Sequence, residues 1–332
     1  MKQFLDGGRP PDSLVFSGGG FKGIAFVGAL RSLKEGYGWD FGLRQPALKK
    51  IMGVSIGAFV AFLIIVGLSL DELLCFVRFC ELGSLFNPNP VGGIFGGIMA
   101  LDDSLTMRSK ISQILKERLH MPTATLLELK NSTGISLLIG VTNLKKLTFE
   151  CLGPDTHPDL DVCDAIIASM AIPPIFAPQK LPGQTLAIDG GITCNYPITE
   201  FKNAESVIGM RFISNPVPIT NSASFSYFAD IMDIIVTPLS EIQWAFTPFS
   251  FKQRTISILA PANGIFGMAE YDVLTANGIA ARAELVSLGM AAGDEAVQAW
   301  HEGKSPKYAE SASPWMSLIA NPLHNAILLI KK

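Results

Sequence analysis

Apolar positions along this chain form short β-type runs and helix-spaced sets, and the two kinds alternate over most of its length. A short apolar run predicts a strand, whereas apolar residues three or four positions apart predict one face of a helix. The predicted strands are 14–16, 50–52, 135–142, 147–151, 186–188, 207–213 and 255–259. The predicted helices are 23–35, 56–70, 70 to about 80, 105–120, 162–170, 225–235 and 274–300. This alternation predicts an α/β fold, a three-layer sandwich in which a mostly parallel sheet has helices on both faces.

The chain contains no internal repeat, low-complexity tract or linker. Its 332 residues are enough for one large domain with a substantial core. We therefore expect a single catalytic domain over 12–302, followed by an irregular tail over 303–332.

The most apolar stretch, 56–70, is shorter than the roughly 20 residues that a membrane-spanning helix needs. We expect a buried helix there and no transmembrane span. The first residues lack the apolar core of a secretory signal, which favours a cytoplasmic location or one at the membrane surface. Export as an effector by another kind of signal stays open.

Composition narrows the class of partner. Hydrophobic residues make up 48% of the chain and charged residues 17%, with a mean hydropathy of +0.36 and a net charge of −3. No dense basic patch is present, so a nucleic-acid partner is not expected. The five cysteines are an odd number and form no C-x-x-C pair, which argues against a disulfide framework and against a zinc site.

A glycine-rich turn follows the first predicted strand and opens a helix. Gly18, Gly20 and Gly23 fit the dinucleotide fingerprint G-x-G-x-x-G, and Asp40 lies about twenty residues further on. Asp40 sits in a glycine-rich segment rather than at the end of an apolar strand, which weakens that interpretation. A tight turn without a ligand is the plainer alternative. If a ligand binds, the amides at the helix start would face an anion, and a tetrahedral oxyanion is such an anion.

A second motif, Gly53-Val54-Ser55-Ile56-Gly57, has the G-x-S-x-G pattern of a nucleophile elbow. It ends a predicted strand and starts a predicted helix, which is the context that supports Ser55 as a nucleophile. A serine needs a base, and the four histidines lack a convincing catalytic setting. His301 gives the formal order Ser-Asp-His, but it stands in a polar helix end. The other three are His120, His157 and His324.

Asp189 ends the predicted strand 186–188 and is followed by Gly190 and Gly191. A carboxylate there would lie at the carboxyl edge of the sheet, where active sites of α/β proteins form. An ordinary Asp-Gly turn is the simpler interpretation of this motif taken alone.

The three motifs together resemble the patatin-like phospholipase family. The segment 168–178 is similar to the family's Ala-Ser-x-Ala-x-Pro-x-x-Phe-x-Pro, apart from a double proline at 173–174. Asn195-Tyr196-Pro197 matches its Asn-x-Pro. The resemblance covers about residues 12–215.

The resemblance implies a Ser-Asp dyad that works without histidine. In it, Ser55 is the nucleophile, Asp189 activates it, and Gly18, Gly19 and Gly20 form the oxyanion hole. Lys22 stands where the family carries Arg or Lys. The implied activity is a lipid acyl hydrolase of the phospholipase A type that forms an acyl-serine intermediate and uses no metal or organic cofactor.

A lipid substrate suits an apolar composition, and peripheral contact with membrane or micellar lipid follows. Candidate contact residues are Phe95 and Ile98, within a segment 91–100 that is better interpreted as a packed loop than as a mobile lip. An aromatic stretch is the other candidate, with ordinary core as its alternative: Trp244, Phe246, Phe249 and Phe251.

Three rival functions remain open. The first is a histidine-dependent serine esterase, and the second is a dinucleotide-binding oxidoreductase. The third is a catalytically silent module that binds or regulates lipid.

Overall fold

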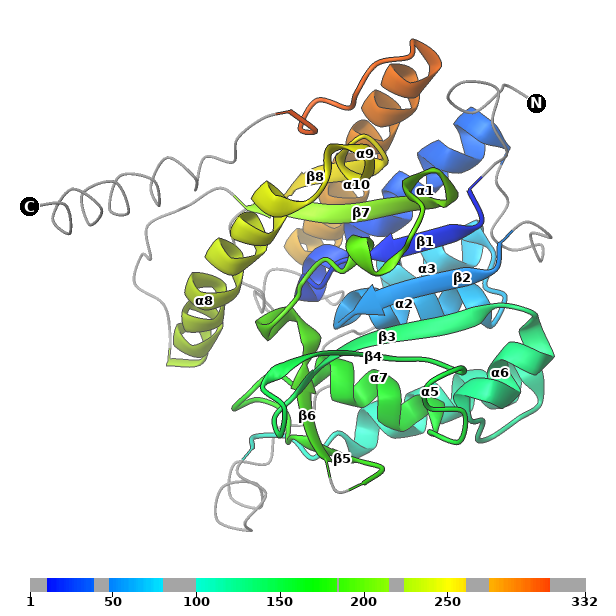
Figure 1. Cartoon of the computed structure of the whole chain (residues 1–332), viewed down its shortest axis with the longest axis vertical. Coiled ribbons are helices and arrows are strands. Elements are labelled where there is room, and N and C mark those ends of the chain that lie inside the picture. The colour runs from blue at the N-terminus through cyan, green and yellow to red at the C-terminus, as the bar shows by residue number, and fades with distance from the viewer. Residues whose placement is uncertain are drawn as a thin grey trace, which may run out of the picture.

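A sheet of eight strands lies at the centre of the described part of the chain, with helices on both faces (Figure 1). This computed structural model describes residues 11–38, 48–79, 100–183, 185–214, 224–260 and 275–310. Pairing runs in the order β5-β6-β3-β2-β1-β7-β8, and β4 also pairs with β3. The strands are β1 (Ser13–Phe16), β2 (Lys50–Val54), β3 (Ser136–Asn143), β4 (Thr148–Leu152), β5 (Gln179–Leu181), β6 (Thr185–Asp189), β7 (Val207–Ser214) and β8 (Thr255–Ala260).

The strand directions confirm the predicted fold class. β1, β2, β3, β7 and β8 are all parallel to their neighbours in this set. β4 and β6 run antiparallel to β3, and β5 runs antiparallel to β6. Every residue of β1 is buried, as expected for a central strand with helices on both sides.

The larger hydrophobic core lies on one face of the sheet. Because successive side chains of a strand point to opposite faces, Leu14 and Phe16 enter this core while Val15 does not. Seven helices contribute to it: α1 (Ile24–Tyr37), α2 (Ile56–Ile65), α3 (Leu70–Phe79), α5 (Leu105–Leu119), α6 (Leu126–Thr133), α7 (Val162–Met170) and α10 (Ala276–His301).

Helices α1 and α10 cross at a point where both sequences carry glycine. A Cβ atom on Gly28 would lie 2.0 Å from the carbonyl oxygen of Val286, and one on Gly289 would lie 1.8 Å from that of Ala25. The missing side chains therefore let the two backbones touch, which brings α10 against the first helix of the chain.

A smaller core covers the other face. Val15 and Met52 point into it from the sheet, and Tyr196, Trp244 and Phe251 pack on them. Trp244 belongs to α8 (Ser224–Phe246), and Phe251 belongs to α9 (Phe249–Lys252). The smaller core thus fixes the carboxyl half of α8 beside the sheet.

Most predicted elements occur, with two differences in extent. The apolar stretch 56–70 breaks between α2 and α3, and Ser69 and Glu72 cap α3 with reciprocal hydrogen bonds of 2.8 and 3.2 Å. The helix predicted over 225–235 continues to Phe246 as α8 and contains Pro238. A proline inside a helix removes a hydrogen bond and normally ends the helix, so the sequence pattern does not extend α8 past it.

Helix α2 is buried almost throughout, as predicted for the stretch behind Ser55. In the ranges that the structure describes, no helix combines the length and the apolar character needed to cross a bilayer. Phe95 and Ile98 lie outside those ranges, as do Asp40 and His324.

Candidate active site

Ser55 occupies a sharp turn between β2 and α2. Its backbone has φ 54° and ψ −126°, a region that costs free energy for any residue other than glycine. The two flanking glycines make the turn sterically feasible. A Cβ on Gly53 would lie 2.2 Å from the carbonyl oxygen of Gly57, and one on Gly57 would lie 2.6 Å from the carbonyl oxygens of Phe16 and Ser17. The spacing of the G-x-S-x-G motif therefore has a direct steric cause.

A buried hydrogen-bond chain holds the Ser55 turn in place. The Ser55 amide donates to Ser169 Oγ at 2.8 Å, and Ser169 Oγ donates to the carbonyl oxygen of Gly140 at 2.7 Å. Ser169 is fully buried in α7. Ser169 lies in the segment 168–178 that resembles the family motif, but no role was predicted for it. The local pattern does not show which distant amide donates to its hydroxyl.

Two strands that run in opposite directions bring Ser55 and Asp189 together. β4 takes one edge of β3 over residues 139–143, so β2 and β6 must share the other edge. Along that edge Val54 pairs with Gly140, and Asp189 pairs with the next residue, Val141. The carboxyl ends of β2 and β6 therefore meet.

The predicted position of Asp189 is confirmed, but the reason for it differs. Its location was expected from a strand of the parallel sheet, whereas β6 is antiparallel to β3. Asp189 reaches the carboxyl edge of β2 because β6 overlaps β3 by only three residues. Its main chain is fixed there, with its amide donating to the Ala171 carbonyl at 3.0 Å and its carbonyl accepting from Thr142 Oγ1 at 2.8 Å.

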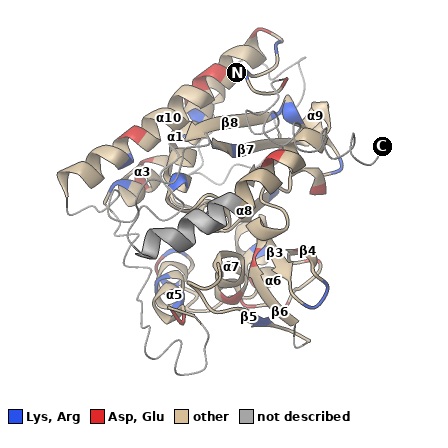
Figure 2. Ribbon diagram, turned by 90° about the vertical axis from the view of Figure 1, so that its left-hand side faces the viewer, with Lys and Arg blue, Asp and Glu red and all other residues tan. Residues whose placement is uncertain are grey.

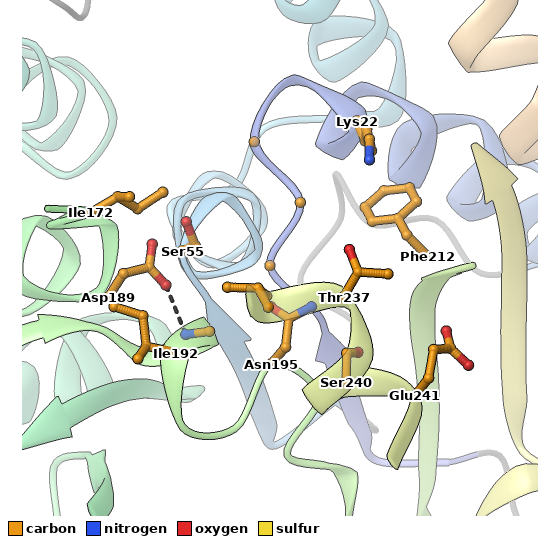
Figure 3. A pocket seen from close by; sticks show the side chains of 15 residues that line it. Lys22, Ser55, Ile172, Asp189, Ile192, Asn195, Phe212, Thr237, Ser240 and Glu241 are labelled. Atoms are coloured by element: carbon orange, nitrogen blue, oxygen red, sulfur yellow. Dashed lines mark hydrogen bonds between the residues drawn. The ribbon is translucent and has the colours of Figure 1, made fainter. Parts of the chain in front are cut away.

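The Asp189 carboxyl group is buried and only half satisfied. Oδ1 accepts a hydrogen bond from the Gly191 amide at 2.7 Å, whereas Oδ2 has no partner among the described residues. Burial raises the pKa of Asp189 from 3.8 to about 7, while the Ser55 hydroxyl and the Gly191 amide act to lower it. Figure 3 shows the Ser55 and Asp189 side chains next to each other. A carboxyl with this pKa can accept and return a proton near neutral pH.

The predicted glycine turn joins β1 to α1 and faces the same cavity. The Gly18 amide donates to the carbonyl oxygen of Asn195 at 3.2 Å, so this amide is already used in holding the turn. No backbone carbonyl in the described ranges accepts from the amides of Gly19 or Gly20. Gly20 has φ 55°, which favours glycine. Of the three predicted donors, two therefore have no backbone acceptor within those ranges.

A cavity of about 640 Å³, including its open mouth, connects these groups. Ile172, Ile192, Phe212 and Val236 form its apolar part. Its polar part comprises Lys22, Ser55, Asp189, Asn195, Thr237, Ser240 and Glu241, together with the glycine turn.

Four of the lining residues come from α8. Three of them, Thr237, Ser240 and Glu241, lie across the cavity from Ser55 in Figure 3. The four were not predicted as site residues because the predicted helix 225–235 ends before Val236. Asn195 belongs to the predicted Asn-x-Pro match, but the motif does not predict that its carbonyl accepts a hydrogen bond from the glycine turn.

None of the three histidines in the described ranges lines this cavity. His120 ends α5, and the His157 ring contacts Thr156 Oγ1 at 3.0 Å. The His301 ring packs edge-on against Tyr37 with the ring centres 4.9 Å apart. A histidine-dependent esterase therefore gains no support from this geometry.

The sequence model of the family described as patatin-like phospholipase matches residues 14–202, more than half of the chain. This chain belongs to the patatin-like phospholipase family. The matched region contains the glycine turn, Ser55, Ser169, Asp189 and Asn195.

Two viral proteins are similar in sequence to this family member. An uncharacterized protein of Acanthamoeba polyphaga mimivirus is 27% identical over 209 residues, covering 61% of this chain and 66% of that protein. A probable lipid hydrolase of Invertebrate iridescent virus 6 is 26% identical over 190 residues, covering 56% of this chain and 61% of that protein. The chain thus matches less than two thirds of the length of each relative.

One solved structure shares the fold. VipD from Legionella pneumophila aligns with a TM-score of 0.55 at 18% identity, covering 88% of this chain and 67% of that one. At this identity the likeness shows a shared fold alone.

Proposed function

We propose that this patatin-like protein hydrolyses carboxylic ester bonds of phospholipids as a phospholipase A, through an acyl-serine intermediate. The observation that supports it most is the meeting of β2 and β6, which puts Ser55 beside a buried carboxyl group with one open oxygen. We also propose that residues 12–302 act as one catalytic domain.

In the first half-reaction Ser55 Oγ attacks the ester carbonyl carbon and passes its proton to Asp189 Oδ2. The carbonyl oxygen becomes an oxyanion, which the Gly19 and Gly20 amides stabilise. One such donor contributes about 3–4 kcal/mol in the transition state of a comparable reaction. The bond to the leaving alcohol then breaks, and Asp189 gives its proton to that oxygen.

In the second half-reaction water attacks the acyl-Ser55 carbonyl carbon and passes a proton to Asp189. The bond to Ser55 Oγ breaks, Asp189 returns the proton to Ser55, and the free fatty acid leaves. The four apolar side chains of the cavity offer a surface for the acyl chain, and the polar side chains offer one for the headgroup. Every group used in these steps belongs to the chain, the lipid or water.

Acyl release from defined lipids tests this function. Vesicles of phosphatidylcholine labelled in one acyl chain should yield free fatty acid and lysophospholipid, and a fluorophosphonate should modify the peptide that contains Ser55. Emulsified triacylglycerol serves as the competing substrate, and a soluble short-chain ester reports on the site without a lipid surface. Vesicle binding with no acyl release and no fluorophosphonate adduct would instead favour a silent lipid-binding module.

The pH dependence of catalysis should follow the proton on Asp189. Because the base must be ionised, kcat/KM for the soluble ester should rise about tenfold per pH unit in acid and level off above the pKa of Asp189. That pKa is about 7, so the midpoint is expected near neutral pH. A midpoint near 4, measured where thermal melts show the protein to be folded, would contradict this role of the buried carboxyl group.

A further inference from the structure

Helix α8 carries an apolar stripe on its outer surface. Ile235, Leu239, Ile242 and Phe246 recur every three or four residues and therefore share one face of the helix. Phe246 is 84% exposed, Leu239 47% and Ile235 41%, while Ile242 is half-buried. Phe249, at the start of α9, is also exposed and extends the set. We refer to these five residues as the outer stripe.

The opposite face of the same helix turns lines the active-site cavity. Val236, Thr237, Ser240 and Glu241 border the cavity, and they alternate in sequence with the residues of the outer stripe. Neighbouring residues of a helix are about 100° apart around its axis, so the cavity-lining residues lie roughly opposite the stripe. A surface that touched the stripe would therefore lie against the side of α8 that faces away from the cavity.

Buried contacts hold α8 in the orientation that exposes the stripe. Glu241 lies 3.4 Å from the Arg211 guanidinium, and both side chains are almost fully buried. The Arg211 guanidinium also stacks over the Trp244 ring at 4.0 Å. Gln243, next to Trp244, donates to Cys194 Sγ at 2.6 Å, in the loop that follows Asp189. The exposure of the stripe is thus a consequence of how the opposite face is anchored.

Charge around the stripe suits a lipid surface. Glu241 is the sole charged residue between 235 and 250, and its carboxylate is buried against Arg211. Figure 2 shows the described part of α8 mainly in the tan of uncharged residues. The next charged residue is Lys252, whose ammonium group lies 5.3 Å from the Trp244 ring centre and donates to the Ala245 carbonyl. The patch therefore presents apolar side chains, a cation at one end and no exposed carboxylate, as an interfacial helix does.

We propose that the outer stripe is the surface by which this protein docks on a phospholipid bilayer. The proposal rests on the proposed function, since it names the surface that would keep the enzyme at the bilayer that contains its substrate. Docked in this way, α8 lies between the bilayer and the cavity that its opposite face lines. The protein then needs no transmembrane segment to reach its substrate.

The test measures vesicle binding separately from hydrolysis. The full chain carrying Ser55→Ala leaves the lipid intact, and flotation with vesicles of phosphatidylcholine and phosphatidylglycerol reports binding. Adding Leu239→Ser and Phe246→Ser should weaken the partition coefficient about 100-fold, since each removes a large apolar side chain from the bilayer contact. The matched control, Phe79→Ser with Leu105→Ser, removes two similarly exposed apolar side chains from α3 and α5 and should leave binding unchanged.

The soluble ester separates docking from catalysis. With Ser55 restored, Leu239→Ser with Phe246→Ser should keep wild-type hydrolysis of the soluble ester and lose hydrolysis of vesicles. Unchanged vesicle binding by this variant would overturn the docking surface, as would a change from dimer to monomer with binding retained, which would make the stripe an interface between two copies. If the wild type binds vesicles through the stripe but releases no acyl chain, the proposed function fails while the docking surface stands.

A second variant covers the case in which the serine substitutions disturb folding. Phe246→Trp keeps the apolar surface, and brominated lipids should quench its added emission, whereas Phe79→Trp should gain no quenching. Equal quenching of the two would count against the outer stripe.

Discussion

Replacing Asp189 by asparagine should abolish ester hydrolysis. Asparagine keeps the shape of the side chain and can still accept from the Gly191 amide, but it cannot take the proton from Ser55. Losing a member of a serine hydrolase's catalytic set costs about 10⁴- to 10⁶-fold in kcat. Ser55→Ala should cause a loss in the same range, and the double variant should be no worse than the poorer single variant, because the two side chains act as a unit.

Initial rates on the soluble ester, with fluorophosphonate labelling as a second readout, check this prediction. Asp102→Asn provides the matched control. Asp102 is also a buried carboxylate, 2% exposed, and its Oδ1 accepts from the Ser104 amide, yet it does not line the cavity. It should lower stability and leave kcat close to the wild-type value. If Asp189→Asn retained a tenth of the activity or more, another group would have to be the base.

The same substitution should make the fold more stable in mild alkali. The pKa of Asp189 is about 7 in the folded protein, against an ordinary value of 3.8. Between those two values the unfolded chain has already released this proton and the folded chain has kept it, so the stability of the wild type falls as pH rises. Above pH 7 the full cost is present, about 4 kcal/mol for a shift of this size. Asparagine does not ionise and so avoids this cost. Urea melts should therefore show Asp189→Asn to be more stable than the wild type in mild alkali, with no such difference near pH 4.

Ser169→Ala should slow catalysis by about 100-fold, although Ser169 does not line the cavity. The alanine leaves the Ser55 amide and the Gly140 carbonyl without their buried partner. Each unpaired group costs about 1–3 kcal/mol, and the strained turn at Ser55 can relieve that cost by relaxing. A shift of about 1 Å in a reacting atom is enough for a 100-fold loss.

A positioning role predicts a specific kinetic pattern for Ser169. The kcat for the soluble ester and the rate of fluorophosphonate labelling should fall together while KM changes little, and Ser169→Thr should restore part of both. Ser32→Ala is the matched control, since Ser32 Oγ is equally buried and donates to the distant Met290 carbonyl at 3.0 Å. If Ser32→Ala slowed labelling as much as Ser169→Ala, the effect would be one of general stability.

Most elements of the fold were predicted from a local pattern, although α6 was missed despite its capping box of Thr125 and Glu128. β1, β2 and α7 follow from apolar runs and periodicity, and the cap at Ser69 follows from a reciprocal pair three residues apart. The carboxyl half of α8 was not predictable, because Pro238 would normally stop a helix. Buried contacts of Glu241 and Trp244 with the strand β7 stabilise it there, and those partners are distant in sequence.

The candidate site divides in the same way. The local motif was enough to predict that Ser55 sits in a strained turn, and the structure shows why: only glycine fits at positions 53 and 57 against the neighbouring backbone. The sequence by itself also determined that Gly18, Gly19 and Gly20 open a helix, and that Asp189 ends a strand.

Only the tertiary structure decided which of these groups meet. β6 pairs antiparallel with the same edge of β3 that β2 occupies, and this pairing brings Asp189 next to Ser55. The register of these strands depends on packing far from either residue, so the local sequence does not predict it. Three other features also depend on tertiary packing. They are the burial of Asp189, the hydrogen bond from the Gly18 amide to the Asn195 carbonyl, and the hydrogen bond from the Ser55 amide to Ser169 Oγ. Local sequence sets backbone conformation, whereas the proton affinity and the free donors of the site depend on neighbours that only the folded chain supplies.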